Sequence, residues 1–196
     1  MTRKKEDGTL EIGGYKGEES ILSVPAAIGK FSVTSIGDYA FSPYGPRVRN
    51  RDIRRKIQSV QIPAGVTEIG DKAFYGCGSL AGIMLPDSIT EIGENAFYEC
   101  SSLTGITLPK GLREIGKNTF VNCNSLKCIA LPDSVTKIRS YAFRSCKNLT
   151  GIIIPASVTE IQNSAFWGCN KKTIHAPIGS YAEEYAKKHR IPFVAE

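Results

Sequence analysis

Apolar and polar positions along this chain repeat with a period of 23 residues, and the pattern fills residues 63–169. The stretch Pro86–Leu108, PDSITEIGENAFYECSSLTGITL, recurs in phase on both sides of itself. A fixed period of this length is typical of a repeat solenoid, in which each coil buries its apolar face against its neighbours. The repeat is marked by prolines at Pro63, Pro86, Pro109, Pro132 and Pro155, by phenylalanines at Phe74, Phe97, Phe120, Phe143 and Phe166, and by cysteines at Cys77, Cys100, Cys123, Cys146 and Cys169.

Each unit predicts two short extended pieces and a turn. The first piece, as in Leu103–Leu108, ends at a proline because proline has no N–H for further strand pairing. The second piece carries two apolar residues three positions apart, such as Leu112 and Ile115. A polar turn then leads to a phenylalanine, which follows an alanine in most units. We expect these rings, with Phe41 at the front, to enter the core and form one continuous spine.

Residues 1–62, which precede the regular repeats, are predicted to form an N-terminal cap, a degenerate first repeat and then an insertion. Thr9–Ile12 and Ile21–Val24 are expected to be short strands with a glycine-pair turn, Gly13-Gly14, between them. Val24–Phe41 is the degenerate first repeat, since its Ile-Gly and Ala-Phe pairs take the slots of the later repeats. An irregular first unit is expected because it must cover an apolar end that no neighbour covers.

Residues 170–196 predict a C-terminal cap. Ser180 is a suitable N-cap for a short helix over Tyr181–His189, which has basic residues near its end. Ile191–Val194 then reads as a closing strand. Together with the five regular repeats, the two caps predict a single domain over 1–196.

The six cysteines favour buried free thiols over disulfides or a zinc site. Five of them share one slot of the repeat, so their Cβ atoms lie on coils about 4.8 Å apart and point in parallel. A disulfide needs Cβ atoms about 3.8 Å apart that face each other, and zinc favours close pairs such as C-x-x-C, which do not occur here. Cys128 stands in a slot that is Gly82, Gly105 and Gly151 elsewhere, so we expect it to be the accessible thiol.

Positive charge is concentrated in the insertion before the regular repeats. The net charge is +6, and residues 42–58 contribute six basic side chains against the single acid Asp52. Because the forked donors of arginine suit carboxylates, sulfates and phosphates, one interpretation is a patch for an acidic partner. The other is a solvated loop or short helix that shields the first coil. The patch would consist of Arg47, Arg49, Arg51, Arg54, Arg55 and Lys56.

Two rows of repeat positions are candidate protein-binding surfaces. One row faces outward from the predicted long sheet and is partly apolar, which suits a protein or an extended peptide. The other follows the phenylalanines and contains Tyr, Arg and Trp, the residue types that dominate interface hot spots. Its side chains are equally expected to pack over the turn beneath them. The candidates are Met84, Thr107 and Ile153 in the first row and Tyr75, Tyr98, Arg144 and Trp167 in the second.

The motif P-x-S-[VI]-T-x-I-G-x-x-A-F-x-x-C-x-S-L-x-x-I resembles the BspA-type leucine-rich repeat. The resemblance extends over Pro63–Cys169, and the ending GSYAEEYAKKHRIPF is similar to the terminal cap of that family. It implies a curved right-handed solenoid with parallel sheets, from a bacterial and often surface-exposed protein. It also implies an extracellular or cell-surface location and binding to host proteins, matrix proteins or other cells.

The residues argue against catalysis, and neither a cofactor nor a metal is expected. The two histidines, His175 and His189, lie in or beside the C-terminal cap, and no catalytic triad or phosphate-binding glycine loop is recognised. No apolar run is long enough to span a membrane, and the start, MTRKKEDGTL, lacks the apolar stretch of a signal peptide. We therefore expect a monomeric, non-enzymatic protein-binding module for adhesion. The alternatives are binding of an acidic polymer, a sulfated glycan or nucleic acid, through residues 47–56, and a structural spacer.

Overall fold

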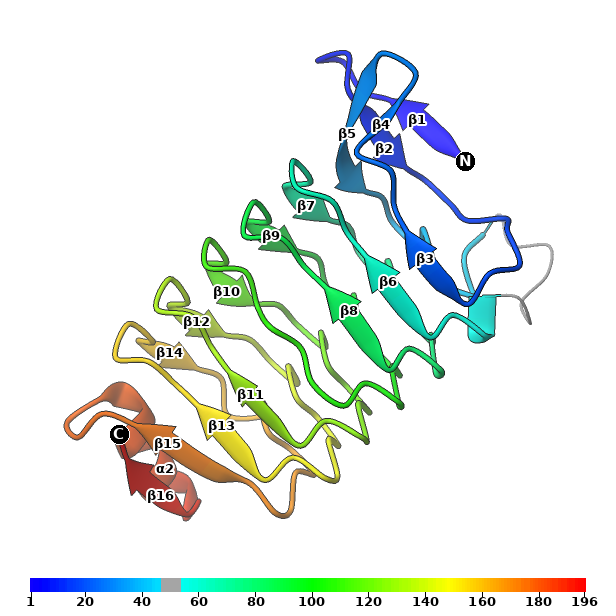
Figure 1. Cartoon of the computed structure of the whole chain (residues 1–196). Coiled ribbons are helices and arrows are strands. Elements are labelled where there is room, and N and C mark those ends of the chain that lie inside the picture. Colours follow the sequence, from blue (N-terminus) through cyan, green and yellow to red (C-terminus); the bar gives the residue numbers. More distant parts are fainter. Residues whose placement is uncertain (47–53) are drawn as a thin grey trace.

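The computed structural model describes residues 1–46 and 54–196. They form a solenoid whose coils stack along one axis, with the N-terminus at one end and the C-terminal helix at the other (Figure 1). Most coils contribute one strand to a side here called the broad face and a shorter strand to a side called the narrow face. Where strands of neighbouring regular coils pair, they pair in parallel. The predicted repeat solenoid with parallel sheets is therefore confirmed.

Broad-face strands span three or four residues, and narrow-face strands between regular coils span two. The broad face contains β3(Ile21–Ser23), β6(Ser59–Gln61), β8(Gly82–Met84), β11(Cys128–Ala130), β13(Gly151–Ile153), β15(Thr173–Ala176) and β16(Phe193–Ala195). The narrow face contains β1(Thr2–Lys4), β2(Leu10–Ile12), β4(Ala27–Ile28), β5(Phe31–Ile36), β7(Glu68–Ile69), β9(Glu91–Ile92), β10(Glu114–Ile115), β12(Lys137–Ile138) and β14(Glu160–Ile161).

Neighbouring coils pair in the register set by the repeat period. On the broad face Val60 lies opposite Ile83, and on the narrow face Ile69 lies opposite Ile92. The degenerate first repeat joins the same ladder, because Ile36 pairs with Ile69. The two strands predicted in the N-terminal cap form as β2 and β3, whereas the antiparallel additions β1 and β4 were not predicted.

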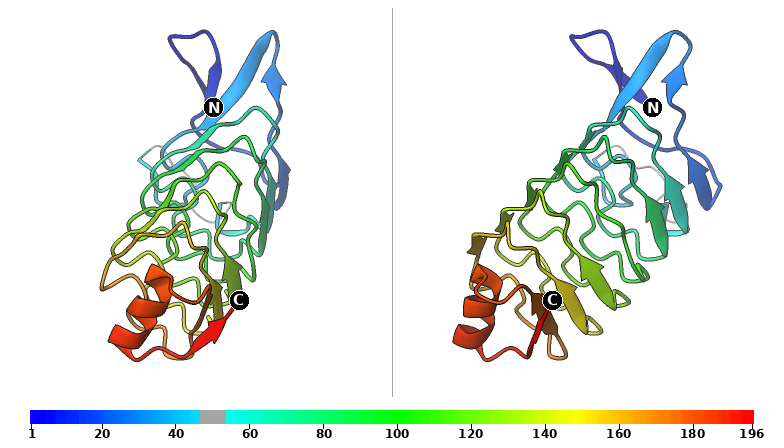
Figure 2. Two further views of the ribbon diagram at one scale, coloured as in Figure 1. Left: turned by 90° about the vertical axis from the view of Figure 1, so that its left-hand side faces the viewer. Right: turned by 60° about the vertical axis from the view of Figure 1, so that its left-hand side comes forward.

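The C-terminal cap contains the predicted helix. α2(Tyr181–His189) begins after Ser180, whose side chain accepts a hydrogen bond from the Glu183 N–H. The helix lies against the last coil, where it contacts β14 and β15 (Figure 2). The closing strand β16 begins at Phe193, two residues later than the predicted start at Ile191.

A column of phenylalanine rings runs through the core. Six rings from Phe41 to Phe166 stack with centroids 5.0–5.5 Å apart. Tyr15 covers the first ring, and Tyr185 from α2 covers the last. The predicted spine is therefore confirmed, and a tyrosine closes each of its ends.

The five periodic cysteines form a second column beside the rings. All five are buried free thiols, and Cys128 is an exposed free thiol, as predicted. Each buried Sγ–H donates to the carbonyl oxygen of the phenylalanine in the preceding coil, at 2.8–3.3 Å. Burial raises the pKa of the Cys77 thiol to about 12 and also raises the pKa values of Cys100 and Cys123. These three thiols therefore stay protonated and act as donors between coils.

Two slots of the repeat take the left-handed backbone conformation, and they turn the chain around the ring column. The first slot precedes the Ala-Phe pair and the second precedes the cysteine. Their non-glycine members have φ between 55° and 59°, a conformation that favours glycine and is tolerated by asparagine. The first slot holds Tyr39, Lys72, Asn95, Asn118 and Tyr141, and the second holds Gly76, Glu99, Asn122, Ser145 and Gly168.

Both strand ladders are interrupted at the second regular coil, which creates a seam between β9 and β10. In the part of the chain that the structure describes, β9 and β10 are not paired, and residues 105–107 form no strand between β8 and β11. The prediction of a strand at Leu103–Leu108 is therefore wrong, although both end residues are buried. The turn side stays continuous, since the Phe97 N–H donates to the Thr119 carbonyl at 3.0 Å.

Two hydrogen bonds that join other coils are missing at the seam among the described residues. Asp71 Oδ1 accepts from the Glu94 N–H of the next coil at 2.7 Å, but Glu94, which takes the same slot, makes no such bond within the described residues. In the next coil along, Ser134 Oγ donates to the Leu112 carbonyl of the coil before it at 2.7 Å. Gly111 occupies the same repeat position as Ser134, one coil earlier, and has no hydroxyl to donate across the seam. Glu94 and Gly111 thus each leave one fewer hydrogen bond between the two coils that meet at the seam.

Truncation of a central ring tests the phenylalanine column. Phe120→Ala deletes a fully buried ring that stacks on two neighbours, so we expect the free energy of unfolding to fall by about 3–5 kcal/mol. Urea unfolding followed by circular dichroism measures the change. The exposed Lys117→Ala in the same coil is the control, with a change below about 0.5 kcal/mol. An unchanged midpoint for Phe120→Ala would contradict the register.

The buried thiols predict a loss of stability in alkaline solution. Because burial raises the pKa of Cys123 above its ordinary value of 9.0, this thiol stays protonated in the folded protein but ionises in the unfolded chain. The unfolded state then binds fewer protons, so each such thiol lowers the free energy of unfolding by about 1.4 kcal/mol per pH unit above that value. Below it, this stability is fully present.

Urea unfolding at about pH 8 and about pH 10 measures this dependence. Cys123→Ala should lose less stability between the two pH values than the wild-type protein. Cys128→Ala, which removes an exposed thiol, should lose as much as the wild type. Equal losses in all three proteins would show that the buried thiols do not govern the pH response.

Candidate interaction surfaces

Arg54, predicted as a member of the acidic-partner patch, lies in the protein interior with 5% of its surface exposed. Its guanidinium donates to the carbonyls of Ser42 at 2.8 Å, Tyr39 at 3.1 Å and Tyr15 at 2.9 Å. Burial lowers its pKa. These bonds join the N-terminal cap to the turn around the first ring, so Arg54 is not available to a partner. Sequence alone did not separate it from its neighbours, because nothing in an arginine-rich insertion marks which side chain turns inward.

Two further members of the predicted patch, Arg55 and Lys56, are described by the structure. Arg55 and Lys56 are exposed. Arg55 Nη2 donates to the Tyr44 hydroxyl at 3.0 Å, and its guanidinium carbon lies 5.5 Å from the centre of the Tyr44 ring. The predicted members Arg47, Arg49 and Arg51 belong to 47–53 and lie outside the described residues.

The row after the phenylalanines is packed in the N-terminal half of the solenoid. Tyr75 and Tyr98 are half-buried, and their rings stack with centroids 4.7 Å apart. Tyr44 meets Tyr75 edge-on at 5.7 Å, and Val121 in the next coil is buried. In this half, the side chains pack over the turn beneath them, which was one of the two interpretations of the row.

The C-terminal half of the same row is exposed. The guanidinium carbon of Arg144 lies 4.8 Å from the ring centre of Trp167 and 5.4 Å from that of Tyr141. Trp167 is 59% exposed and Tyr141 37% exposed, and no carboxylate in the described chain forms an ion pair with Arg144. We call these three residues the tryptophan cluster. Tyr141 was not among the predicted residues, because it occupies another slot of the repeat.

The outward row of the broad face exposes isolated apolar side chains. Met84 is 59% exposed and Ile153 is 45% exposed, and Thr107 is also exposed. Ile153 lies opposite His175 in the ladder, so the row continues into the C-terminal cap. Small and polar residues separate the apolar members, so this face offers no continuous apolar patch.

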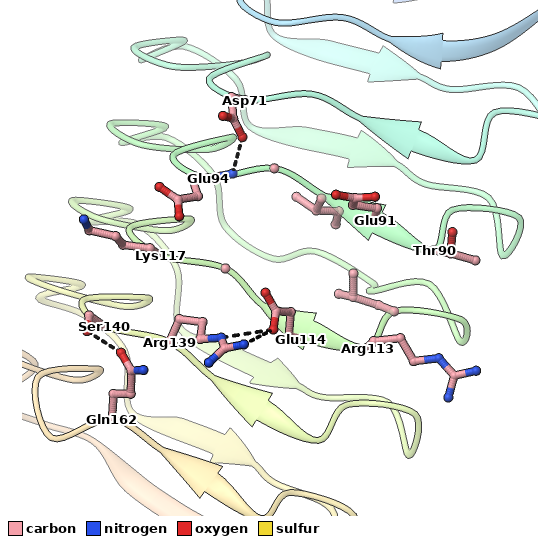
Figure 3. Close-up of a pocket in the computed structure, with 14 residues that line it drawn as sticks. Asp71, Thr90, Glu91, Glu94, Arg113, Glu114, Lys117, Arg139, Ser140 and Gln162 are labelled. Carbon is pink, nitrogen blue, oxygen red and sulfur yellow. Dashed lines mark hydrogen bonds and ion pairs between the residues drawn. The ribbon is translucent and has the colours of Figure 1, made fainter.

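A charged trough of about 720 Å³ lies over the seam on the narrow face (Figure 3). Gly93 and Gly116 line it, and side chains of both signs surround it. Arg139 Nη2 donates to Glu114 Oε2 at 2.7 Å, and Arg139 Nη1 lies 3.5 Å from Glu160 Oε1. In these ion pairs the positive and negative side chains of the trough neutralise each other, so the trough does not present a single sign of charge to a ligand.

Within residues 1–46 and 54–196, no three His, Cys, Asp or Glu side chains come together in a way that could hold a metal ion. Over the same ranges, the structure contains no helix with the length and apolar character that a membrane span requires.

Comparison with known protein families identifies the repeat. A family model described as a BspA type leucine rich repeat region matches the chain in six copies, over residues 53–173. The chain belongs to the BspA-type leucine-rich repeat family. This confirms the resemblance of the repeat motif, and leucine-rich repeat proteins are generally non-catalytic binding modules. None of the curated proteins compared with this BspA-type chain matches it.

Solved structures of bacterial leucine-rich repeat proteins are similar to this BspA-type chain. The leucine rich repeat protein TpLRR of T. pallidum is 29% identical, with a TM-score of 0.83, and the match covers 100% of this chain and 94% of TpLRR. A leucine rich cell surface protein of Faecalibacterium prausnitzii is 34% identical, with a TM-score of 0.65, over 89% of this chain and 52% of that protein. The pneumococcal vaccine antigen PcpA, at 17% identity and a TM-score of 0.72, shares the fold over 97% of this chain and 46% of its own.

Two adjacent arginines of the BspA-type chain provide a test of the buried guanidinium. Arg54→Ala leaves three carbonyls without their donor, so we expect the free energy of unfolding to fall by about 3 kcal/mol. Arg54→Lys should recover only part of this loss, because an ammonium lacks the planar fork of guanidinium. Arg55→Ala, at an exposed position, should change it by less than about 1 kcal/mol. Thermal unfolding measures all three, and equal effects at both positions would contradict the assignment.

Proposed function

We propose that this BspA-type protein is a non-catalytic adhesion module that binds a protein at a cell surface or in the surrounding matrix. The tryptophan cluster is the centre of the binding surface. One observation carries this proposal, namely that Trp167 is 59% exposed while Arg144 holds its ring at 4.8 Å. Tryptophan, tyrosine and arginine are the residues whose truncation weakens protein interfaces most.

The backbone beneath the cluster supports this role. The Ser145 N–H donates to the Trp167 carbonyl at 2.8 Å, so the two neighbouring turns are joined directly under the rings. Side chains on a rigid scaffold lose little conformational freedom on binding, which leaves more of the contact energy for affinity. Met84, Thr107 and Ile153 on the broad face, and the half-buried Tyr75 and Tyr98, are proposed as weaker contacts, because no comparable exposed aromatic group is found among them.

The family and its similar structures support a surface location. The Faecalibacterium prausnitzii protein, which is 34% identical, is described as a cell surface protein. Binding of an acidic polymer through residues 47–56 is the competing proposal. Its basic patch has one residue fewer than expected, because Arg54 is buried. A structural spacer is the third, and it predicts that no partner exists.

Capture of solubilised cell-surface and matrix proteins tests the proposal. The immobilised wild-type protein should retain a partner, and Trp167→Ala or Arg144→Ala should weaken its affinity about 30-fold, the effect of a hot-spot truncation. Lys171→Ala, exposed at the same end of the solenoid, is the control and should bind as the wild type does.

Salt separates the competing proposals. Binding through the tryptophan cluster should change little between about 50 and 200 mM salt, whereas binding of a polyanion should weaken steeply over that range. Loss of binding in Arg55→Gln with Lys56→Gln, and full retention in Trp167→Ala, would replace the proposal by its acidic-polymer alternative. The absence of any partner would favour the spacer.

A further inference from the structure

A shallow groove of about 600 Å³ crosses several coils on the turn side of the solenoid, next to the tyrosine rings. We call it the corner groove. Its volume lies in the range of small-ligand sites, about 300–1,000 Å³. Its chemistry is set by six of its lining residues, Tyr44, Arg55, Glu99, Asn122, Asn124 and Lys147.

The two ends of the corner groove are positive and its middle is polar. Arg55, fixed on the Tyr44 ring, marks one end, and the exposed Lys147 marks the other. The Tyr44 ring lies over Gly76, in the space that a Cβ would fill, and Gly76 and Lys147 belong to coils three steps apart. At about 4.8 Å per coil, the groove is about 14 Å long.

The middle of the corner groove retains side chains at a cost in backbone strain. Glu99 and Asn122 occupy the left-handed slot before the cysteine, with φ of 59° each. Glycine fills this slot in the first and last regular coils, at Gly76 and Gly168. A non-glycine residue in this conformation costs about 1 kcal/mol or more, and such strain clusters at functional sites. Glu99 is the one acidic residue in this slot, and it places a carboxylate in the lining of the groove.

Asn124 provides an independent observation. Its Oδ1 is shielded from water and accepts no hydrogen bond from any described residue. A buried unpaired acceptor is unfavourable, and no protein partner fixes the orientation of this amide. If the Asn124 amide rotates toward the corner groove, its Oδ1 can accept a hydrogen bond from a ligand bound there, and the acceptor is then satisfied.

The lining excludes two other classes of ligand. Nucleic acid requires a groove that is positive throughout, and Glu99 lies in the middle of this one. A peptide that binds through an apolar anchor or by strand addition needs an apolar pocket or an open strand edge, whereas the lining side chains here are mostly polar. The lining combines charged donors, a carboxylate acceptor, amides and hydroxyls, which together match a surface of hydroxyl groups that donate and accept.

We propose that the corner groove binds a carboxylated oligosaccharide. Carboxylates near its two ends pair with Arg55 and Lys147, and the hydroxyl and amide groups of the uncharged sugar between them meet Glu99, Asn122 and Asn124. This proposal is independent of the tryptophan cluster, which lies outside the groove lining.

Titration with hyaluronan hexasaccharide tests the proposal, because this probe carries a carboxylate on alternate sugars and no sulfate. Backbone amide NMR should show saturable shifts concentrated at Gly76, Gly78, Ser101 and Asn122. Asn124→Ala should weaken binding about fivefold, the effect of one hydrogen bond, while thermal stability is unchanged or raised because a buried unpaired acceptor is gone. Asn170→Ala, in the same slot of the repeat but outside the groove, is the control and should bind normally.

Several outcomes would overturn the proposal. These are the absence of saturable shifts, shifts spread evenly over the solenoid, and equal weakening by Asn170→Ala and Asn124→Ala. Tighter binding of a heparin hexasaccharide, with shifts centred on Lys56, would identify a general polyanion patch instead. Trp167→Ala should leave hyaluronan binding unchanged, so the failure of the protein-binding proposal and the failure of this one can be told apart.

Discussion

Each coil of this solenoid places its phenylalanine ring and its cysteine thiol over the ring and carbonyl of the coil before it. The rings stack at 5.0–5.5 Å, and each buried thiol donates to a phenylalanine carbonyl one coil back. One residue gained or lost between Phe97 and Cys100 would break both contacts at once. Extra residues therefore occur where no cysteine follows the ring, in the coil of Phe41, and there Arg54 takes over by bonding the turn carbonyls directly.

The sequence predicts the parts of the fold that follow from periodicity. The register, the ring column, the buried thiols and the helix α2(Tyr181–His189) are all fixed by slots that the repeat or its capping residue marks. It does not reveal features that depend on which way one side chain turns. Arg54 is such a case, and so is the seam, where Gly111 replaces the serine of the neighbouring coils and Glu94 replaces the Asp71 of the coil before it.

For the candidate sites, the sequence identifies unusual residue types, and the structure shows which of them are exposed. The slot after the phenylalanines was found because Tyr, Arg and Trp stand out there, but only coordinates separate the packed Tyr98 from the exposed Trp167. The corner groove was not found, because its side chains come from slots that hold glycine in other coils. Glu99 occupies a slot that is glycine at Gly76 and Gly168, and this is the sequence signal that could have indicated the groove. The signal can be interpreted only with the left-handed φ that the structure gives.

Both proposed sites lie on the turn side, where the ladder of backbone hydrogen bonds is continuous across the seam. The strand ladders are interrupted between β9 and β10, yet the turn ladder crosses the same place without a break, through the Phe97 N–H to the Thr119 carbonyl at 3.0 Å and the Glu99 N–H to the Val121 carbonyl at 2.8 Å. Any flexing at the seam would therefore open the charged trough on the narrow face and leave the turns nearly fixed. A binding surface on the turns keeps its geometry through such motion, so a ligand there loses little of its contact energy to ordering the protein.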